Sequence, residues 1–173
     1  MKQYTKFNNI SGWAVFAIAA WVFLSTIEMT GSFWDCGEFI AAAYKLQIGH
    51  PPGAPLFLML SRIMTLFAGS DLQSIPIMVN AFSALMSAFA VLFTFWTITA
   101  IARKIVFVKN QEPSLAQILT VVASGVVGAM AFTFTDSFWF SAVEGEVYAT
   151  SQFFTCIVVW AVFKWENVAD EKH

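Results

Sequence analysis

The chain has 173 residues, of which 58% are hydrophobic and 12% are charged, and its net charge is −2. Soluble domains contain about 45–50% apolar and about 25% charged residues, and a domain of this size cannot hide such an apolar excess from water. These values exclude a soluble globular enzyme, a disordered tail and a nucleic-acid binder, which needs a basic surface, and they predict a multi-span membrane protein.

Four apolar stretches are long enough to cross a bilayer, which takes about 20 residues. They cover residues 10–27, 77–102, 115–135 and 148–165. Apart from Lys164 at the end of the last, they contain no Asp, Glu, Lys or Arg. Because the backbone must satisfy its own hydrogen bonds in hydrocarbon, each is expected to be a helix. The first has a long apolar part and no small-residue cleavage site after it, so we interpret it as an uncleaved anchor.

A fifth apolar stretch, 54–68, has 15 residues and carries Arg62. Its length favours an interfacial or re-entrant helix over a span. If it does not cross the membrane, seven of the nine basic residues fall on the side of the two termini, and only Lys45 and Arg62 fall on the other. The positive-inside rule prefers this arrangement. The sequence therefore predicts an all-α, polytopic membrane protein with four transmembrane helices, cytoplasmic termini and interfacial helices in the first outer loop.

This topology treats 1–173 as one membrane domain with outer loops at 28–76 and 136–147. In the first loop, Asp35 and Glu38 are three residues apart and would share one face of a helix. Residues 39, 40, 43 and 46 of that helix are expected to lie against the membrane surface. His50 precedes two prolines, whose fixed φ angles make a rigid turn that would hold an imidazole near the two acids.

Simpler interpretations exist for each of these residues. The Asp35–Glu38 spacing is also that of a helix capping box. His50 can be a plain turn residue, and Arg62 can reach lipid phosphates from an interfacial helix. Cys36 and Cys156 are too few for a disulfide framework, so we expect free thiols, the second of them buried in a span.

The second outer loop is also acidic. Glu144 and Glu146 flank Gly145, where the backbone can approach another segment closely. The alternative is a polar hairpin that only joins two spans.

Three segments resemble motifs of the family 117 glycosyltransferases. They are Phe-Trp-Asp-Cys-Gly-Glu-Phe-Ile-Ala-Ala at 33–42, Gly-His-Pro-Pro-Gly at 49–53 and Ser-Ala-Val-Glu-Gly-Glu-Val-Tyr at 141–148. The resemblance runs from about residue 27 to 165. It implies a GT-C enzyme similar to protein O-mannosyltransferases. Such enzymes take a sugar from a polyprenyl-phosphate carrier on the outer side of the membrane. GT-C enzymes have many more than four spans, so we expect this chain to be the N-terminal part of such a module.

The resemblance and the chemistry together suggest roles for individual residues. Asp35 and Glu38 are the expected catalytic residues, with Asp35 as the base that activates an acceptor hydroxyl. His50 and Arg62 would neutralise the donor phosphate. Glu144, Glu146 and Tyr148 are further candidates for binding substrate. One histidine and two acids do not define a transition-metal site, so no metal or other cofactor is predicted, although some GT-C relatives use a divalent ion.

The expected function is transfer of a mannose-like sugar to a Ser/Thr hydroxyl of a protein, or to another acceptor, with inversion. Its partners would be the polyprenyl-phosphate sugar, the acceptor and the bilayer, and not nucleic acid. We expect a bacterial inner membrane in preference to the endoplasmic reticulum. Two alternatives stay open: a non-catalytic assembly or anchoring subunit, and a transporter, which the scarcity of charge within the spans disfavours.

Overall fold

The structure, a computed structural model, describes residues 1–108 and 111–169. Within those ranges its regular secondary structure consists of helices, joined by loops, with no strand. Its long helices are α1 (Lys2–Ser25), α4 (Ile75–Val106), α5 (Leu115–Thr133) and α7 (Val147–Ala169). Its shorter helices are α2 (Cys36–Lys45), α3 (Pro55–Thr65), η1 (Leu66–Ala68), η2 (Leu72–Ser74) and α6 (Asp136–Ala142). Lys109 and Lys172, which entered the charge argument, lie outside the described residues.

The described residues contain four helices that are long and apolar enough to cross a membrane, which confirms the predicted number. The first begins at Lys2, eight residues before the predicted start, and the second candidate span runs from Leu72 to Val106. Residues 55–68 form a shorter apolar helix, as the length of that stretch predicted. The fold is therefore the all-α membrane architecture expected from the hydropathy pattern.

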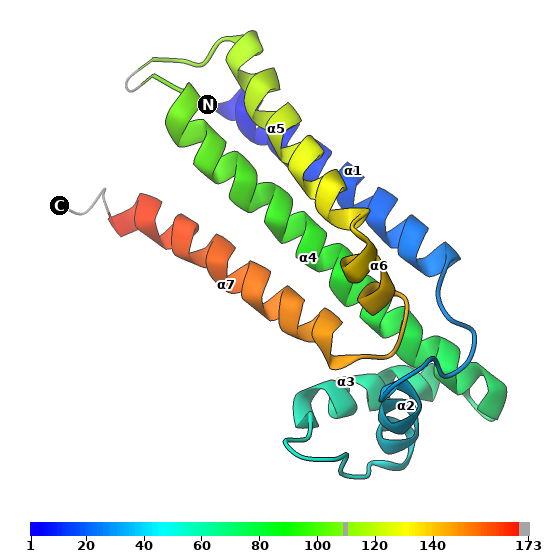
Figure 1. The fold of residues 1–173 in the computed structure, drawn as a ribbon. Coiled ribbons are helices and arrows are strands. Elements are labelled where there is room, and N and C mark those ends of the chain that lie inside the picture. The colour runs from blue at the N-terminus through cyan, green and yellow to red at the C-terminus, as the bar shows by residue number, and fades with distance from the viewer. Residues whose placement is uncertain (109–110, 170–173) are drawn as a thin grey trace.

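Helix α4 is the centre of the bundle and packs against α1, α5 and α7 (Figure 1). Its apolar side chains meet those of the neighbouring helices in one core, in which Phe23, Val91, Phe95 and Ile118 are almost completely buried. Helix α7 is the least enclosed of the four, since its span is only 11% buried. Cys156 on α7, predicted to be buried, is only partly so, and its Sγ lies 3.4 Å from the hydroxyl of Thr94.

Gly125 sets the close approach of α4 and α5. A Cβ atom there would lie 2.5 Å from the methyl of Thr99 and 2.8 Å from the ring of Phe95. Small residues allow such approach between membrane helices. Gly128, one turn later, faces only the flexible tip of Ile98.

We expect Gly125→Ala to destabilise the intact protein by about 1 kcal/mol, because neither the β-branched Thr99 nor the ring of Phe95 can move away. Gly128→Ala is the matched control and is expected to leave stability unchanged or higher, because the tip of Ile98 can change rotamer and alanine favours a helix. Thermal unfolding in detergent checks both. Equal effects of the two substitutions would contradict this account of the packing.

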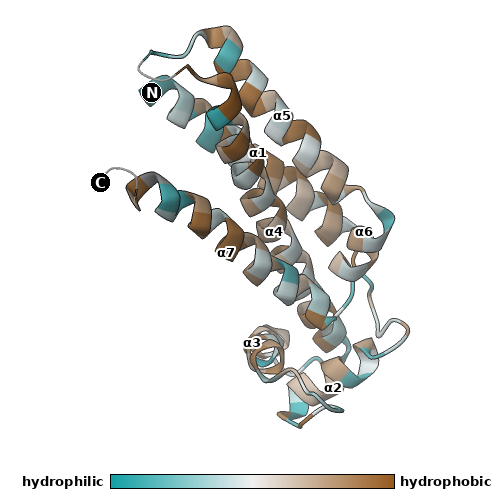
Figure 2. Cartoon of the chain, turned by 60° about the vertical axis from the view of Figure 1, so that its left-hand side comes forward, coloured by the Kyte–Doolittle hydropathy of each residue, from teal (hydrophilic) through white to brown (hydrophobic). Residues whose placement is uncertain are grey.

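The two predicted outer loops meet at one end of the bundle. Helices α2, α3 and α6 lie at this end, whereas the N-terminus and the α4–α5 connection lie at the other (Figure 1). This is the arrangement that four spans and a non-crossing 54–68 segment require. Figure 2 shows hydrophilic residues on α2 at this end of the molecule.

One expectation for α2 is wrong. Its apolar residues Phe39, Ile40 and Ala43 do not form a free face for the membrane surface, because they are buried against α3 and α4. Phe39 packs edge-on against Phe57 of α3. Leu46 alone of the four predicted surface residues is exposed. Helix α2 is therefore fixed to the bundle through protein contacts, and its polar face, with Glu38, turns outward.

Candidate active site

Three side chains from the first outer loop meet at the start of α2. The backbone N–H of His50 donates to Oε1 of Glu38 at 2.7 Å, and its Nδ1 lies 2.9 Å from Oε2 of the same carboxylate. The other ring nitrogen, Nε2, lies 3.7 Å from Oδ2 of Asp35. The three groups are about half exposed. The predicted meeting of the imidazole with both acids is confirmed.

The geometry at the start of α2 excludes the capping-box interpretation. Asp35 occupies the N-cap position, but its side chain makes no capping hydrogen bond, and its backbone is already helical at φ −86° and ψ −5°. Both carboxylate oxygens of Glu38 bond to His50 instead of turning back to the helix start. His50 is also a turn residue, since its carbonyl accepts from the N–H of Gly53 at 2.8 Å. His50 therefore serves both as a turn residue and as the partner of Glu38.

The charges of this group stabilise one another. Hydrogen bonding to Glu38 raises the pKa of His50, and the negative charges of Glu38, Asp35 and Glu146 act in the same direction. The two hydrogen bonds from His50 lower the pKa of Glu38. Glu38 thus favours the protonated form of His50. The carboxylate of Asp35, 3.7 Å from the same ring, keeps an open side toward solvent.

A second pair of acids lies behind the first. Glu144 and Glu146 in the loop between α6 and α7 are each only 5% exposed, so this loop is not the plain polar hairpin of the alternative interpretation. Burial, followed by the charges of Glu144 and Asp35, raises the pKa of Glu146 to about 7. Burial also raises the pKa of Glu144, whose Oε2 has no hydrogen-bond partner. The site therefore contains a carboxyl group that exchanges its proton near neutral pH.

Asn80 of α4 anchors these loops, and the sequence analysis did not single it out. Its fully buried amide donates to the carbonyls of Glu28 at 2.6 Å and Thr30 at 3.0 Å. A Cβ at Gly145 would lie 3.0 Å from the Asn80 amide oxygen and 2.9 Å from Val79. This confirms the predicted close approach at Gly145. A polar amide within an otherwise apolar span was the signal that could have identified Asn80.

Arg62 lies apart from the acid–histidine group. Arg62 donates to the carbonyl of Tyr44 at 2.8 Å and to the hydroxyl of Thr65 at 3.2 Å. It thereby ties α3 to the last turn of α2, about 13 Å along that helix from Asp35. Tyr148 is the second residue of α7 and is 60% exposed. Their roles toward a substrate stay predictions.

An apolar hollow of about 350 Å³ adjoins the site. It lies between the turn after α2 and the start of α3, and its lining includes Ile48, Pro52, Leu58 and Met59. Ile48 and Met59 are strongly exposed there. Because Gly49 also lines it, the hollow begins next to His50, and an apolar chain could lie in it with a charged end at the imidazole.

The same three side chains are the one group in the described part of the chain that could hold a metal ion. Asp35, Glu38 and His50 each offer one ligand atom, all within 4.8 Å of one another. A proton on His50, which both acids stabilise, competes with a metal for the imidazole. The absence of a metal requirement stays a prediction.

Comparison with known proteins places this site in a family. Residues 35–173 match the model of the protein O-mannosyl-transferase TMEM260 N-terminal domain. The matched range of this chain includes Asp35, Glu38, His50 and both buried glutamates. The chain belongs to this family. The match does not extend to an assignment to family 117 or to the GT-C superfamily. No solved structure matches the chain.

Two curated relatives are named protein O-mannosyl-transferase TMEM260. The chain is 28% identical over 160 residues to protein O-mannosyl-transferase TMEM260 of Mus musculus, covering 92% of this chain and 20% of that protein. It is 25% identical over 126 residues to the Dictyostelium discoideum protein of the same name, covering 73% of this chain and 13% of that one. The chain thus spans a fifth or less of the length of these TMEM260 relatives.

Proposed function

We propose that the intact protein is an inverting GT-C glycosyltransferase. It transfers mannose from a polyprenyl-phosphate carrier to a Ser or Thr hydroxyl of a protein. The observation that carries the proposal is the pairing of His50 with Glu38 beside the open carboxylate of Asp35, within residues that match an O-mannosyl-transferase family. A cation and a free base at one exposed point are what transfer from a lipid phosphate needs.

The reaction is a single displacement at the anomeric carbon. The acceptor oxygen forms a bond to that carbon while Asp35 takes the hydroxyl proton. The bond between the carbon and the phosphate oxygen breaks, and polyprenyl phosphate leaves with the electron pair. In this proposal the protonated His50 holds that phosphate, and the hollow lined by Ile48 and Met59 takes the first isoprene units. One base and one in-line attack invert the anomeric centre.

Reconstituted intact protein tests this proposal with two mannose donors. Polyprenyl-phosphate mannose is expected to label an acceptor protein, whereas a nucleotide-linked mannose is expected to be inactive without a carrier. Product analysis should show the α-anomer from a β-linked donor. Transfer from the nucleotide sugar alone, or binding of a protein partner with no transfer from either donor, would favour a different enzyme class or the assembly-subunit alternative.

Metal removal gives a separate prediction. Because the neighbouring acids favour a protonated His50, which would supply the positive charge for the donor phosphate, transfer is expected to continue unchanged after treatment with EDTA and to gain nothing from added Mg²⁺ or Mn²⁺. Initial rates of transfer from the lipid donor measure this. Loss of transfer with EDTA and its recovery with one divalent ion would assign Asp35, Glu38 and His50 to a metal centre instead.

A further inference from the structure

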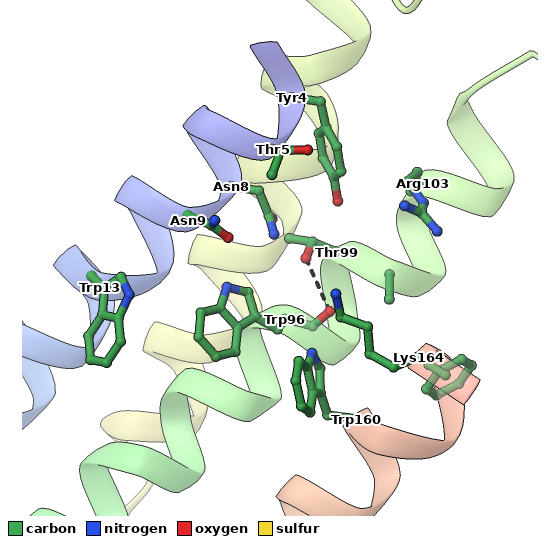
Figure 3. Close-up of a pocket in the computed structure, with 12 residues that line it drawn as sticks. Tyr4, Thr5, Asn8, Asn9, Trp13, Trp96, Thr99, Arg103, Trp160 and Lys164 are labelled. Carbon is green, nitrogen blue, oxygen red and sulfur yellow. Dashed lines mark hydrogen bonds between the residues drawn. The ribbon is translucent and has the colours of Figure 1, made fainter. Parts of the chain in front are cut away.

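Asn80 is a fully buried amide within an apolar span, and both ends of its side chain are bonded. Its nitrogen donates to the carbonyls of Glu28 and Thr30, and its oxygen accepts from the thiol of Cys36, with 3.9 Å between oxygen and sulfur. Asn8 of α1 offers a contrast at the opposite end of the bundle. It lines a cavity of about 300 Å³, and its buried oxygen has no hydrogen-bond partner among the described residues (Figure 3). Because a buried amide is costly unless it is bonded, the partners of Asn80 explain how the span tolerates it.

These partners lie on both sides of Asp35 in the chain. Thr30 comes five residues before Asp35, and Cys36 follows it directly as the first residue of α2. Cys36 is fully buried, so its contact with Asn80 is shielded from water. One side chain of a membrane helix therefore holds both ends of the short segment that carries the proposed base.

The side chains of the segment itself contribute little to its position. Phe33 is 79% exposed, Trp34 is 89% exposed, and the Asp35 side chain is half exposed. Trp34 also has a φ angle of 60°, which is unfavourable for a bulky residue. Such a backbone persists where surrounding contacts fix it. The place of Asp35 thus depends on the buried contacts at the two ends of the segment.

The pair formed by Glu38 and His50 is held in a different way. It lies on the part of α2 that packs against α3, where the ring of Phe39 is edge-on to that of Phe57. The 3.7 Å between Nε2 of His50 and Oδ2 of Asp35 therefore joins two groups with separate supports. Loss of the amide contacts would free Asp35 and leave the imidazole in place.

We propose that Asn80 is a positioning residue for the transfer reaction, which fixes Asp35 relative to His50. The inference rests on the proposed function, since it assigns the base to Asp35 and the donor phosphate to His50. Asn80 touches neither substrate and acts through the backbone of the segment at 30–36. An error of about 1 Å in the place of a reacting group can cost about 100-fold in rate, so this support matters for kcat.

Asn80→Leu in the intact protein tests the proposal, because leucine is close to asparagine in size and removes all of its hydrogen bonds. The kcat for transfer from the lipid donor is expected to fall at least about tenfold, with little change in KM for that donor. Ser83→Ala is the control at a fully buried residue of α4 whose hydroxyl has no partner among the described residues, and it should keep parental kcat. Gly125→Ala, destabilising but distant from the site, should keep it as well.

A second measurement does not need the reaction. In a Cys156→Ser background, the fully buried Cys36 reports whether the segment opens. A thiol reagent is expected to label Cys36 at least about tenfold faster in Asn80→Leu than in the parent or in Ser83→Ala, because two or more buried hydrogen bonds no longer oppose opening. Cys36→Ala is the milder variant. It should lower kcat by a smaller factor and add nothing to Asn80→Leu, since the two residues share one bond.

The outcomes separate this inference from the proposed function. Parental kcat in Asn80→Leu, an equal loss of kcat in Gly125→Ala, or unchanged labelling of Cys36 would each overturn the role of Asn80. A parent protein that transfers from neither donor would contradict the proposed function instead. The labelling rates would then still decide whether Asn80 holds the segment around Asp35.

Discussion

Asp35→Asn is expected to reduce transfer from the lipid donor by at least about 100-fold, the effect of losing a general base. The amide is close in size to the carboxylate but cannot accept the acceptor proton. The loss should fall on kcat, with little change in KM for the donor, because under the proposal His50, which Glu38 orients, would still bind the donor phosphate. Initial rates over a range of donor concentrations separate the two constants.

The same substitution should leave the fold intact. The Asp35 side chain caps no backbone group and is half exposed. Asp136→Asn, at an exposed acid of α6 at the same end of the bundle, is the matched control and is expected to keep parental activity. Parental kcat in Asp35→Asn would remove Asp35 from the mechanism, and a loss shared by both variants would point to structure instead of chemistry.

Glu146→Gln is expected to change how stability depends on pH. Burial raises the pKa of Glu146 from its ordinary 4.5 to about 7, so between these values the folded protein keeps a proton that the unfolded chain has lost. This contribution to stability is complete below pH 4.5 and is lost as pH rises through 7. Glutamine never ionises. The variant should therefore gain about 2 kcal/mol relative to the parent at pH 8, after allowance for water at the site.

Thermal unfolding at pH 5 and at pH 8 measures this. The difference in melting temperature between Glu146→Gln and the parent should rise by several degrees from the lower to the higher pH. Asp136→Asn again serves as the exposed control, with no comparable change. A difference that is the same at both pH values would show that Glu146 ionises in the folded protein as it does in the unfolded chain.

Hydropathy was sufficient to predict the spans, because a bilayer imposes length and apolarity on each helix independently of its neighbours. The approach of His50 to Asp35 and Glu38 was also predictable. Helical spacing places the two acids on one face, and the prolines limit where the following turn can go. These are local rules, and they hold within about one helical turn or one loop.

The errors concern what lies against each side chain. Hydropathy cannot distinguish a lipid from a buried protein surface, so Phe39 and Ile40 were placed on the membrane although they pack on α3 and α4. The burial of Glu144 and Glu146 depends on the chain near residue 30, which Asn80 holds from α4. No local pattern encodes contacts between segments 50 to 110 residues apart. The capping-box interpretation is wrong for a similar reason, because the carboxylate of Glu38 bonds to His50 and not to the backbone at the helix start.

The account depends most on one placement: the acid–histidine site must lie on the side of the membrane opposite the basic end of the bundle. Labelling with a membrane-impermeant thiol reagent in intact cells or sealed vesicles tests this directly. Gln47→Cys and Glu112→Cys, both exposed and at opposite ends, are made in a Cys156→Ser background, while Cys36 is fully buried. Labelling of position 47 but not 112 from outside is the predicted result, and labelling of position 112 alone would contradict the account.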